Sequence, residues 1–157
     1  MLHRHDKIDF TAEVFVVYQD KVLLRMHDKY KMWLGVGGQI ELDEDPNEAA
    51  VREVKEETGL DVALADGLRP FKREMPDYHE LIPPTFMNRH HVSDGHEHIT
   101  LIYFARSRGN AVVMPDGHEE SEETKWFTRE ELEKNEYGIA ETIRVYAVRA
   151  LDVLGEK

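Results

Sequence analysis

A capped helix between Asp45 and Gly59 is the feature that most constrains the fold of this chain. Asp45 can accept hydrogen bonds from the first helical N–H groups, Pro46 suits the first helical position, and Glu48 completes a capping box. Gly59 supplies the left-handed residue at which many helices end. The sequence therefore predicts a helix whose two ends are fixed by local chemistry.

Three glutamates of this helix are predicted to share one face. Glu53, Glu56 and Glu57 are spaced i, i+3 and i+4, so their side chains converge. Like-charged pairs at this spacing destabilise a helix by roughly 0.2–0.5 kcal/mol each, and a bound cation would relieve that repulsion. Carboxylate oxygens at this density suit Mg²⁺ or Mn²⁺. An isolated cluster of this kind is more often a solvated helix face, so the surrounding residues decide between the two interpretations.

The surrounding residues complete a longer pattern, which begins at Gly38 and ends at Leu60. It reads G-x5-E-x7-R-E-U-x-E-E-x-G-U, in which U is a bulky apolar residue. The specified positions are all matched: Gly38, Glu44, Arg52, Glu53, Val54, Glu56, Glu57, Gly59 and Leu60. This segment resembles the Nudix box of the Nudix hydrolase family. Trp33 and Gly37 before the box, and Trp126 with Phe127 after it, extend the resemblance over most of the chain.

The resemblance implies an α/β fold, the Nudix α/β/α sandwich with a mixed β-sheet. At 157 residues the chain is long enough for one compact domain, and we expect a single Nudix hydrolase domain over residues 1–157. The implied activity is metal-dependent hydrolysis, by water attack at phosphorus, of the diphosphate linkage in a nucleoside diphosphate derivative or a nucleoside triphosphate. The alternative is a non-catalytic nucleotide-binding sensor with the same fold, and the intact box favours the enzyme.

The resemblance also implies roles for individual residues. The metal-binding and catalytic carboxylates are Glu53, Glu56 and Glu57, with Mg²⁺ or Mn²⁺ as the cofactor. The resemblance further implies the carbonyl of Gly37 as an additional metal ligand. Glu44 and Arg52 pair to hold the loop that contains Gly38 against the helix, and so support the metal-binding carboxylates from outside.

The general base is left open by the resemblance, because Nudix enzymes take it either from a box glutamate or from a carboxylate in a later loop. Glu119 and Glu120 stand in such a loop, shortly before Trp126. We favour Glu120 and include it among the catalytic residues, although an exposed loop charge explains either glutamate equally well.

Four histidines gather before the apolar strand predicted at Ile99–Ala105: His90, His91, His96 and His98. His96 and His98 are two residues apart, so a strand would point both imidazoles to one face. They could contact a substrate phosphate or a soft metal. Because the chain has no Cys and no second well-spaced ligand pair, structural or exposed histidines are the more frequent explanation, and we leave them outside the metal site.

The remaining elements follow from hydrophobic patterning. Strands are predicted at Thr11–Tyr18, Lys21–Arg25, Leu60–Ala65, Ile99–Ala105, Ala111–Met114 and Lys125–Phe127. Residues 66–97 contain four of the six prolines and are predicted to form a long irregular connection. An amphipathic helix is predicted near the C-terminus, between Ile139 and Leu154. The substrate-binding residues are unknown from the sequence; Tyr18, Phe86, Met87 and Tyr103 could stack on a ring but are more often core residues.

Composition restricts the partners. The 32 acidic and 20 basic residues give a net charge of −12, so we expect no DNA binding. This charge is compatible with the small nucleotide-like substrate that the resemblance implies. No apolar run approaches the length of a membrane span, and the N-terminus lacks a signal-like apolar region, so a cytoplasmic location is the default expectation. The absence of Cys argues against the isopentenyl diphosphate isomerases, which share the box. Homodimer formation is left open.

Overall fold

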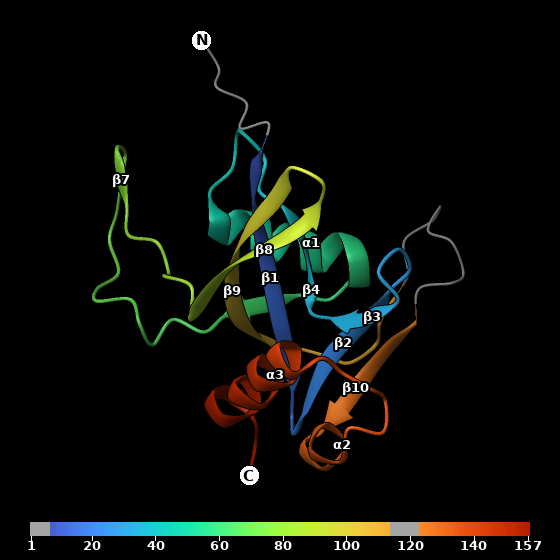
Figure 1. The fold of residues 1–157 in the computed structure, drawn as a ribbon. Helices are drawn as coiled ribbons and strands as arrows, with labels where there is room; N and C mark the ends of the chain where they lie inside the picture. Colours follow the sequence, from blue (N-terminus) through green and yellow to red (C-terminus); the bar gives the residue numbers. More distant parts are fainter. Residues whose placement is uncertain (1–6, 114–122) are drawn as a thin grey trace.

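The computed structural model describes residues 7–113 and 123–157, which form a curled mixed sheet with helices on both faces (Figure 1). The strand order is β10-β2-β1-β9-β5, with β3 paired to β2, β4 to β1 and β8 to β9. β1 and β9 run parallel, whereas the other pairs in this sheet are antiparallel. Its strands are β1 (Ile8–Tyr18), β2 (Lys21–His27), β3 (Met32–Leu34), β4 (Val36–Gln39), β5 (Val62–Leu64), β8 (Phe86–Ser93), β9 (His96–Ser107) and β10 (Thr124–Thr128).

Helices cover the two faces of this sheet. The α1 helix (Pro46–Thr58) contributes Ala49, Ala50 and Val54 to one buried cluster. On the opposite face α2 (Arg129–Lys134) and α3 (Glu141–Leu154) pack on the second buried cluster. This arrangement confirms the predicted α/β/α sandwich with a mixed sheet. No helix in the described ranges is both long and apolar enough to cross a membrane.

The ends of α1 are capped as predicted. The Asp45 side chain accepts hydrogen bonds from the backbone N–H groups of Asn47 and Glu48, and the Glu48 carboxylate accepts from the Asp45 N–H. Gly59 adopts a left-handed φ of 72° and its N–H donates to the Lys55 carbonyl. Thr128 and Glu131 form a second capping box, which begins α2. Local hydrogen bonding therefore fixes the helix that carries the box glutamates.

The side-chain alternation of β1 assigns its residues to the two faces of the sheet. Val14 and Val16 belong to the cluster under α1, whereas Phe15 and Val17 belong to the cluster under α3. Nearer the N-terminal end of β1 the α3 side of the strand becomes polar, with Asp9, Thr11 and Glu13. The apolar core therefore ends part way along β1, and a cavity begins there.

Two predictions for the middle of the chain are wrong. Within residues 66–97, predicted as an irregular connection, the structure has β8 and a small hairpin of β6 (Glu74–Met75) and β7 (Tyr78–His79). β8 is an edge strand that is hydrogen-bonded to β9. Because most of its side chains are exposed, its sequence lacks the apolar pattern from which a strand is predicted. The described residues of Ala111–Met114 form no strand; instead the Val113 N–H donates to the Thr58 carbonyl at the end of α1.

Candidate active site

The three box glutamates leave the same helix but have different partners. Glu53 and Glu56 both accept hydrogen bonds from Nη1 of Arg52, at 2.8 and 3.1 Å. Glu57 points instead to the start of β4, where residues 35–38 form the segment that we call the glycine loop. One Glu57 oxygen accepts from the Gly37 N–H at 3.2 Å, and the other lies 3.1 Å from Nη2 of Arg25. The Glu53 and Glu57 side chains are each 13% exposed, whereas that of Glu56 is 59% exposed. The cluster therefore extends from a buried edge to solvent.

Arg52 joins the helix to the loop that precedes it. Its Nε and Nη2 atoms donate to the two carboxylate oxygens of Glu44 at 2.9 and 2.6 Å, and Nη2 also donates to the Gln39 carbonyl. The hydrogen bond from Arg52 holds the pKa of Glu44 below its usual value, and the hydrogen bond to Glu44 raises the pKa of Arg52. A bidentate pair of this kind fixes both distance and orientation. If Glu44 and Arg52 support the box carboxylates as expected, their role requires a pairing of this kind.

Two glycines allow the close approach between the loop and its neighbours. A Cβ atom on Gly37 would lie 2.0 Å from the Ala12 carbonyl oxygen, and one on Gly38 would lie 2.5 Å from Oε1 of Glu53. Without side chains at these positions, β4 can run close to β1 and the Glu53 carboxylate can rest against the loop backbone.

The donor set at this edge fits a hard divalent cation. Burial raises the pKa of Glu53 despite the neighbouring Arg52, which means that the protein compensates its negative charge incompletely. Glu56 and Glu57 add carboxylate oxygens on the same helix, and Mg²⁺ and Mn²⁺ prefer oxygen ligands.

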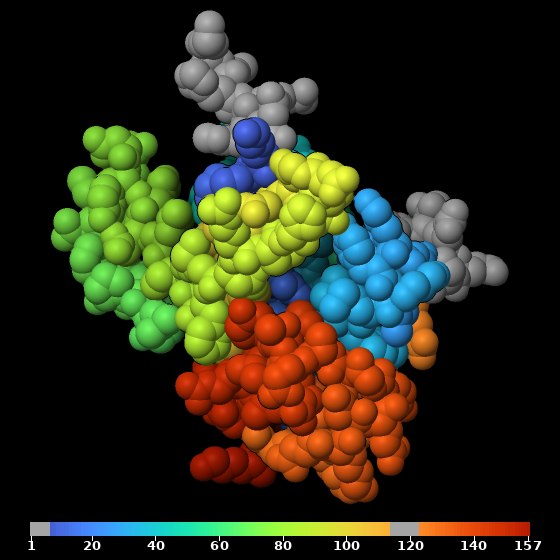
Figure 2. Space-filling view, in the orientation of Figure 1, coloured from blue at the N-terminus to red at the C-terminus, as the bar shows by residue number. Residues whose placement is uncertain are grey.

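A cavity of about 660 Å³ opens beside the glycine loop. Figure 2 shows the hollow between the yellow β8–β9 hairpin, the light-blue segment around β3 and the orange-red α3. Gly37 and Gly38 line it on one side, and Tyr30 and Tyr146 add aromatic rings. Its size falls in the range of small-molecule binding sites.

Glu13 and Arg25 line the cavity and were missed by the sequence interpretation. The Gly35 N–H donates to Oε1 of Glu13 at 2.8 Å. Burial raises the pKa of Glu13 to about 7, against the lowering effects of that hydrogen bond and of Arg25. A charged residue inside an apolar strand such as Thr11–Tyr18 was the available signal for Glu13, because burying a carboxylate is costly unless it serves a site.

The residues suggested for ring stacking do not line the cavity; they are Tyr18, Phe86, Met87 and Tyr103. The Tyr18 ring packs on Trp126, and the Phe86 ring packs on Tyr146. Tyr103 is 2% exposed and Met87 is 58% exposed, so one is core and the other is surface. The general-base candidates Glu119 and Glu120 lie outside the described residues.

Comparison with known proteins finds a family match over most of this chain. The sequence pattern of the NUDIX domain matches residues 9–147. A NUDIX-family hydrolase from Clostridium perfringens is 37% identical, with a TM-score of 0.77 over 96% of this chain and 98% of that one. A MutT NUDIX hydrolase from Burkholderia pseudomallei is 20% identical, with a TM-score of 0.60 over 95% and 99%. A NUDIX hydrolase from Nitrosomonas europaea is 16% identical, with a TM-score of 0.62 over 93% and 89%.

Proposed function

The chain belongs to the NUDIX domain family and is a pyrophosphohydrolase, and we propose that its substrate is a nucleoside diphosphate derivative or a nucleoside triphosphate. The proposed reaction is attack of water on a phosphorus atom of the diphosphate linkage, with Mg²⁺ or Mn²⁺ as cofactor. One observation carries the proposal: Gly37 lines the cavity and also donates its N–H to Glu57 of the carboxylate helix. A ligand in the cavity would therefore have its phosphates beside the box glutamates.

The proposed metal ligands are Glu53, Glu56, Glu57 and the carbonyl of Gly37. A divalent cation bound there would shield the phosphate oxygens and lower the pKa of a water molecule. Arg52 keeps Glu53 and Glu56 close together, while Glu44 holds Arg52 from the loop side. The Arg52 guanidinium thus orders the carboxylates of the box.

Arg25 has a separate positioning role in this proposal. It holds one oxygen of Glu57 while the Gly37 N–H holds the other, so the carboxylate is fixed from two sides. Arg25 is 7% exposed and lines the cavity, where its charge would attract the anionic end of the substrate. Glu120 remains the proposed general base, with Glu119 or a box glutamate as the alternatives.

The nucleoside end of the substrate is proposed to occupy the part of the cavity that aromatic and hydroxyl groups line. Tyr30 is 40% exposed there, and the centroids of its ring and of the His27 ring are 4.5 Å apart. Thr11 and Thr100, joined by a hydroxyl hydrogen bond of 2.7 Å, add polar groups to the lining. Such a combination of aromatic and hydroxyl groups suits a base and a ribose.

The test is a substrate panel assayed with Mg²⁺, with Mn²⁺ and with EDTA, in which nucleoside monophosphate and phosphate products are quantified. We expect turnover only with metal, and we expect the Glu56→Gln/Glu57→Gln variant to lose it by orders of magnitude. Glu133→Gln, on the exposed side of α2, is the matched control and should retain activity. Equal turnover in EDTA would contradict the metal assignment. Tight nucleotide binding without turnover would favour the sensor.

A further inference from the structure

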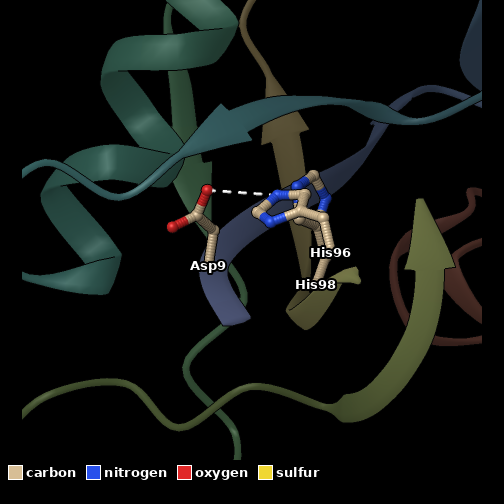
Figure 3. Close-up of side chains that lie close together, drawn as sticks. All are labelled: Asp9, His96 and His98. Atoms are coloured by element: carbon tan, nitrogen blue, oxygen red, sulfur yellow. Dashed lines mark ion pairs between the residues drawn. The ribbon is translucent and has the colours of Figure 1, made fainter. Parts of the chain in front are cut away.

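A second group of metal-ligand side chains lies at the start of β1 and β9, apart from the box glutamates. The parallel register sets Asp9 opposite His98, and His96 precedes His98 by two residues on the same side of its strand. One ligand atom from each of the three side chains lies within 4.8 Å of the other two. Figure 3 shows the Asp9 carboxylate facing the two imidazoles. The sequence interpretation identified the two histidines but not their carboxylate partner.

The distance between two ligand atoms of this group matches the spacing of two ligands around a tetrahedral metal ion. Nε2 of His96 lies 3.3 Å from Oδ2 of Asp9. Two ligands each ~2.0–2.1 Å from a tetrahedral zinc ion would lie roughly 3.3–3.4 Å apart. The His96 and His98 rings have centroids 5.2 Å apart and are nearly perpendicular, at 87°. They meet edge to face, so neither ring is stacked against the other in a parallel arrangement.

His90 supplies a further imidazole from the neighbouring strand. It stands opposite His98 in the β8–β9 ladder, with ring centroids 5.5 Å apart. The His90 Nδ1 atom is hydrogen-bonded to Oδ1 of Asn88 at 2.8 Å, and the Asn88 amide donates in turn to the Tyr146 hydroxyl. Outer hydrogen bonds of this kind fix the ring and tautomer of histidines that bind metals.

The electrostatics favour a cation at this group over an anion. The Asp9 carboxylate would repel a phosphate but would bind a cation.

We propose that Asp9, His96 and His98 form a binding site for a transition metal ion of the Zn²⁺ type, beside His90 of the neighbouring strand. Two or three imidazoles and one carboxylate suit Zn²⁺, whereas Mg²⁺ prefers oxygen ligands alone. The site shares no residue with α1. Asp9, His90 and His98 also line the cavity, so the ion would face a ligand bound there.

The experiment is a Zn²⁺ titration of the Glu56→Gln/Glu57→Gln variant in excess Mg²⁺, with a fluorescent chelator as competitor. This background removes the proposed α1 site while leaving the histidines in place. We expect one tightly bound Zn²⁺ per chain that Mg²⁺ does not displace. Adding His96→Asn or His98→Asn should weaken binding by more than the roughly 10- to 100-fold that the loss of an outer-shell partner costs. His79→Asn, an exposed histidine on β7, is the matched control and should leave the affinity unchanged.

Further measurements test whether the lost Zn²⁺ binding comes from this site. Co²⁺ in place of Zn²⁺ should give d–d absorption bands that disappear in the His98→Asn variant. Circular dichroism and thermal unfolding in EDTA must match the parent protein; should a histidine variant unfold, Asp9→Asn at the start of β1 replaces it. Unchanged Zn²⁺ affinity in the site variants, or an equal loss in the His79→Asn variant, would overturn the proposal. Inorganic phosphate bound through His98 without any Zn²⁺ binding would also overturn it.

Discussion

Replacing Glu13 by Gln is expected to change how the stability of the protein depends on pH. The folded-state pKa of this carboxyl is raised by burial from 4.5 to about 7. A raised pKa means that the folded protein prefers the protonated form, so the contribution of Glu13 to stability is fully present below pH 4.5. It is lost as the pH rises through about 7. Gln resembles protonated Glu, and its oxygen can still accept from the Gly35 N–H.

The size of the effect follows from the shift. A rise from 4.5 to about 7 is roughly 2.5 pKa units, and each unit corresponds to about 1.4 kcal/mol, so ionising Glu13 costs the folded state about 3 kcal/mol. Between pH 5 and pH 8 the free energy of unfolding of the wild-type protein should fall by about 2.5 kcal/mol because Glu13 ionises. The Glu13→Gln variant should show no such loss. The difference in free energy of unfolding between the variant and the wild type should therefore shift in favour of the variant as the pH rises.

Urea unfolding followed by circular dichroism at pH 5 and pH 8 measures the effect. Both proteins are compared in EDTA, so that metal binding at the adjoining glycine loop does not contribute. The difference between variant and wild type at each pH removes the titration of every other group. Glu133→Gln on α2 controls for the loss of a surface charge. A variant that differs from the wild type by the same amount at both pH values would refute the buried-carboxyl interpretation.

Three other substitutions test the support of the carboxylate helix. Arg52→Lys removes the bidentate pair with Glu44, and Mn²⁺ affinity measured by calorimetry should fall roughly 10- to 100-fold; unchanged affinity would contradict its positioning role. Gly38→Ala places a Cβ 2.5 Å from Oε1 of Glu53, so kcat should fall by about tenfold or more while the fold is retained, as steady-state kinetics and thermal unfolding can show. Asp45→Ala removes the cap of α1 and should lower the free energy of unfolding by about 1 kcal/mol, a loss that urea titration would detect.

Features whose cause is local in the chain could be predicted from the sequence. The capping box joins Asp45 to Glu48, and the i, i+3, i+4 spacing that sets Glu53 beside Glu56 lies within a single helical turn. The apolar strand within β9 was likewise visible because it is buried and continuous. These elements are specified by residues a few positions apart, so no knowledge of tertiary structure was needed.

Features whose cause is a distant pairing could not be predicted. β8 has little buried apolar surface, and only its hydrogen bonds to β9 make it a strand. Asp9 joins His96 and His98 because β1 and β9 run parallel, a pairing with no local sequence signal. The same holds for the cavity, where Glu13 becomes significant only once Gly35 and Arg25 lie beside it.

The β1 strand connects the two halves of the proposed active site, because its faces serve different purposes. Val14 and Val16 hold α1, and thereby the box glutamates, on one face of the sheet. Thr11 and Glu13 contribute to the cavity, and Glu13 also stands opposite Gly37 in the β1–β4 ladder. A slip of one residue in β1 would exchange the two faces completely. The alternation of this one strand therefore sets both where the carboxylate helix docks and which chemical groups face a ligand.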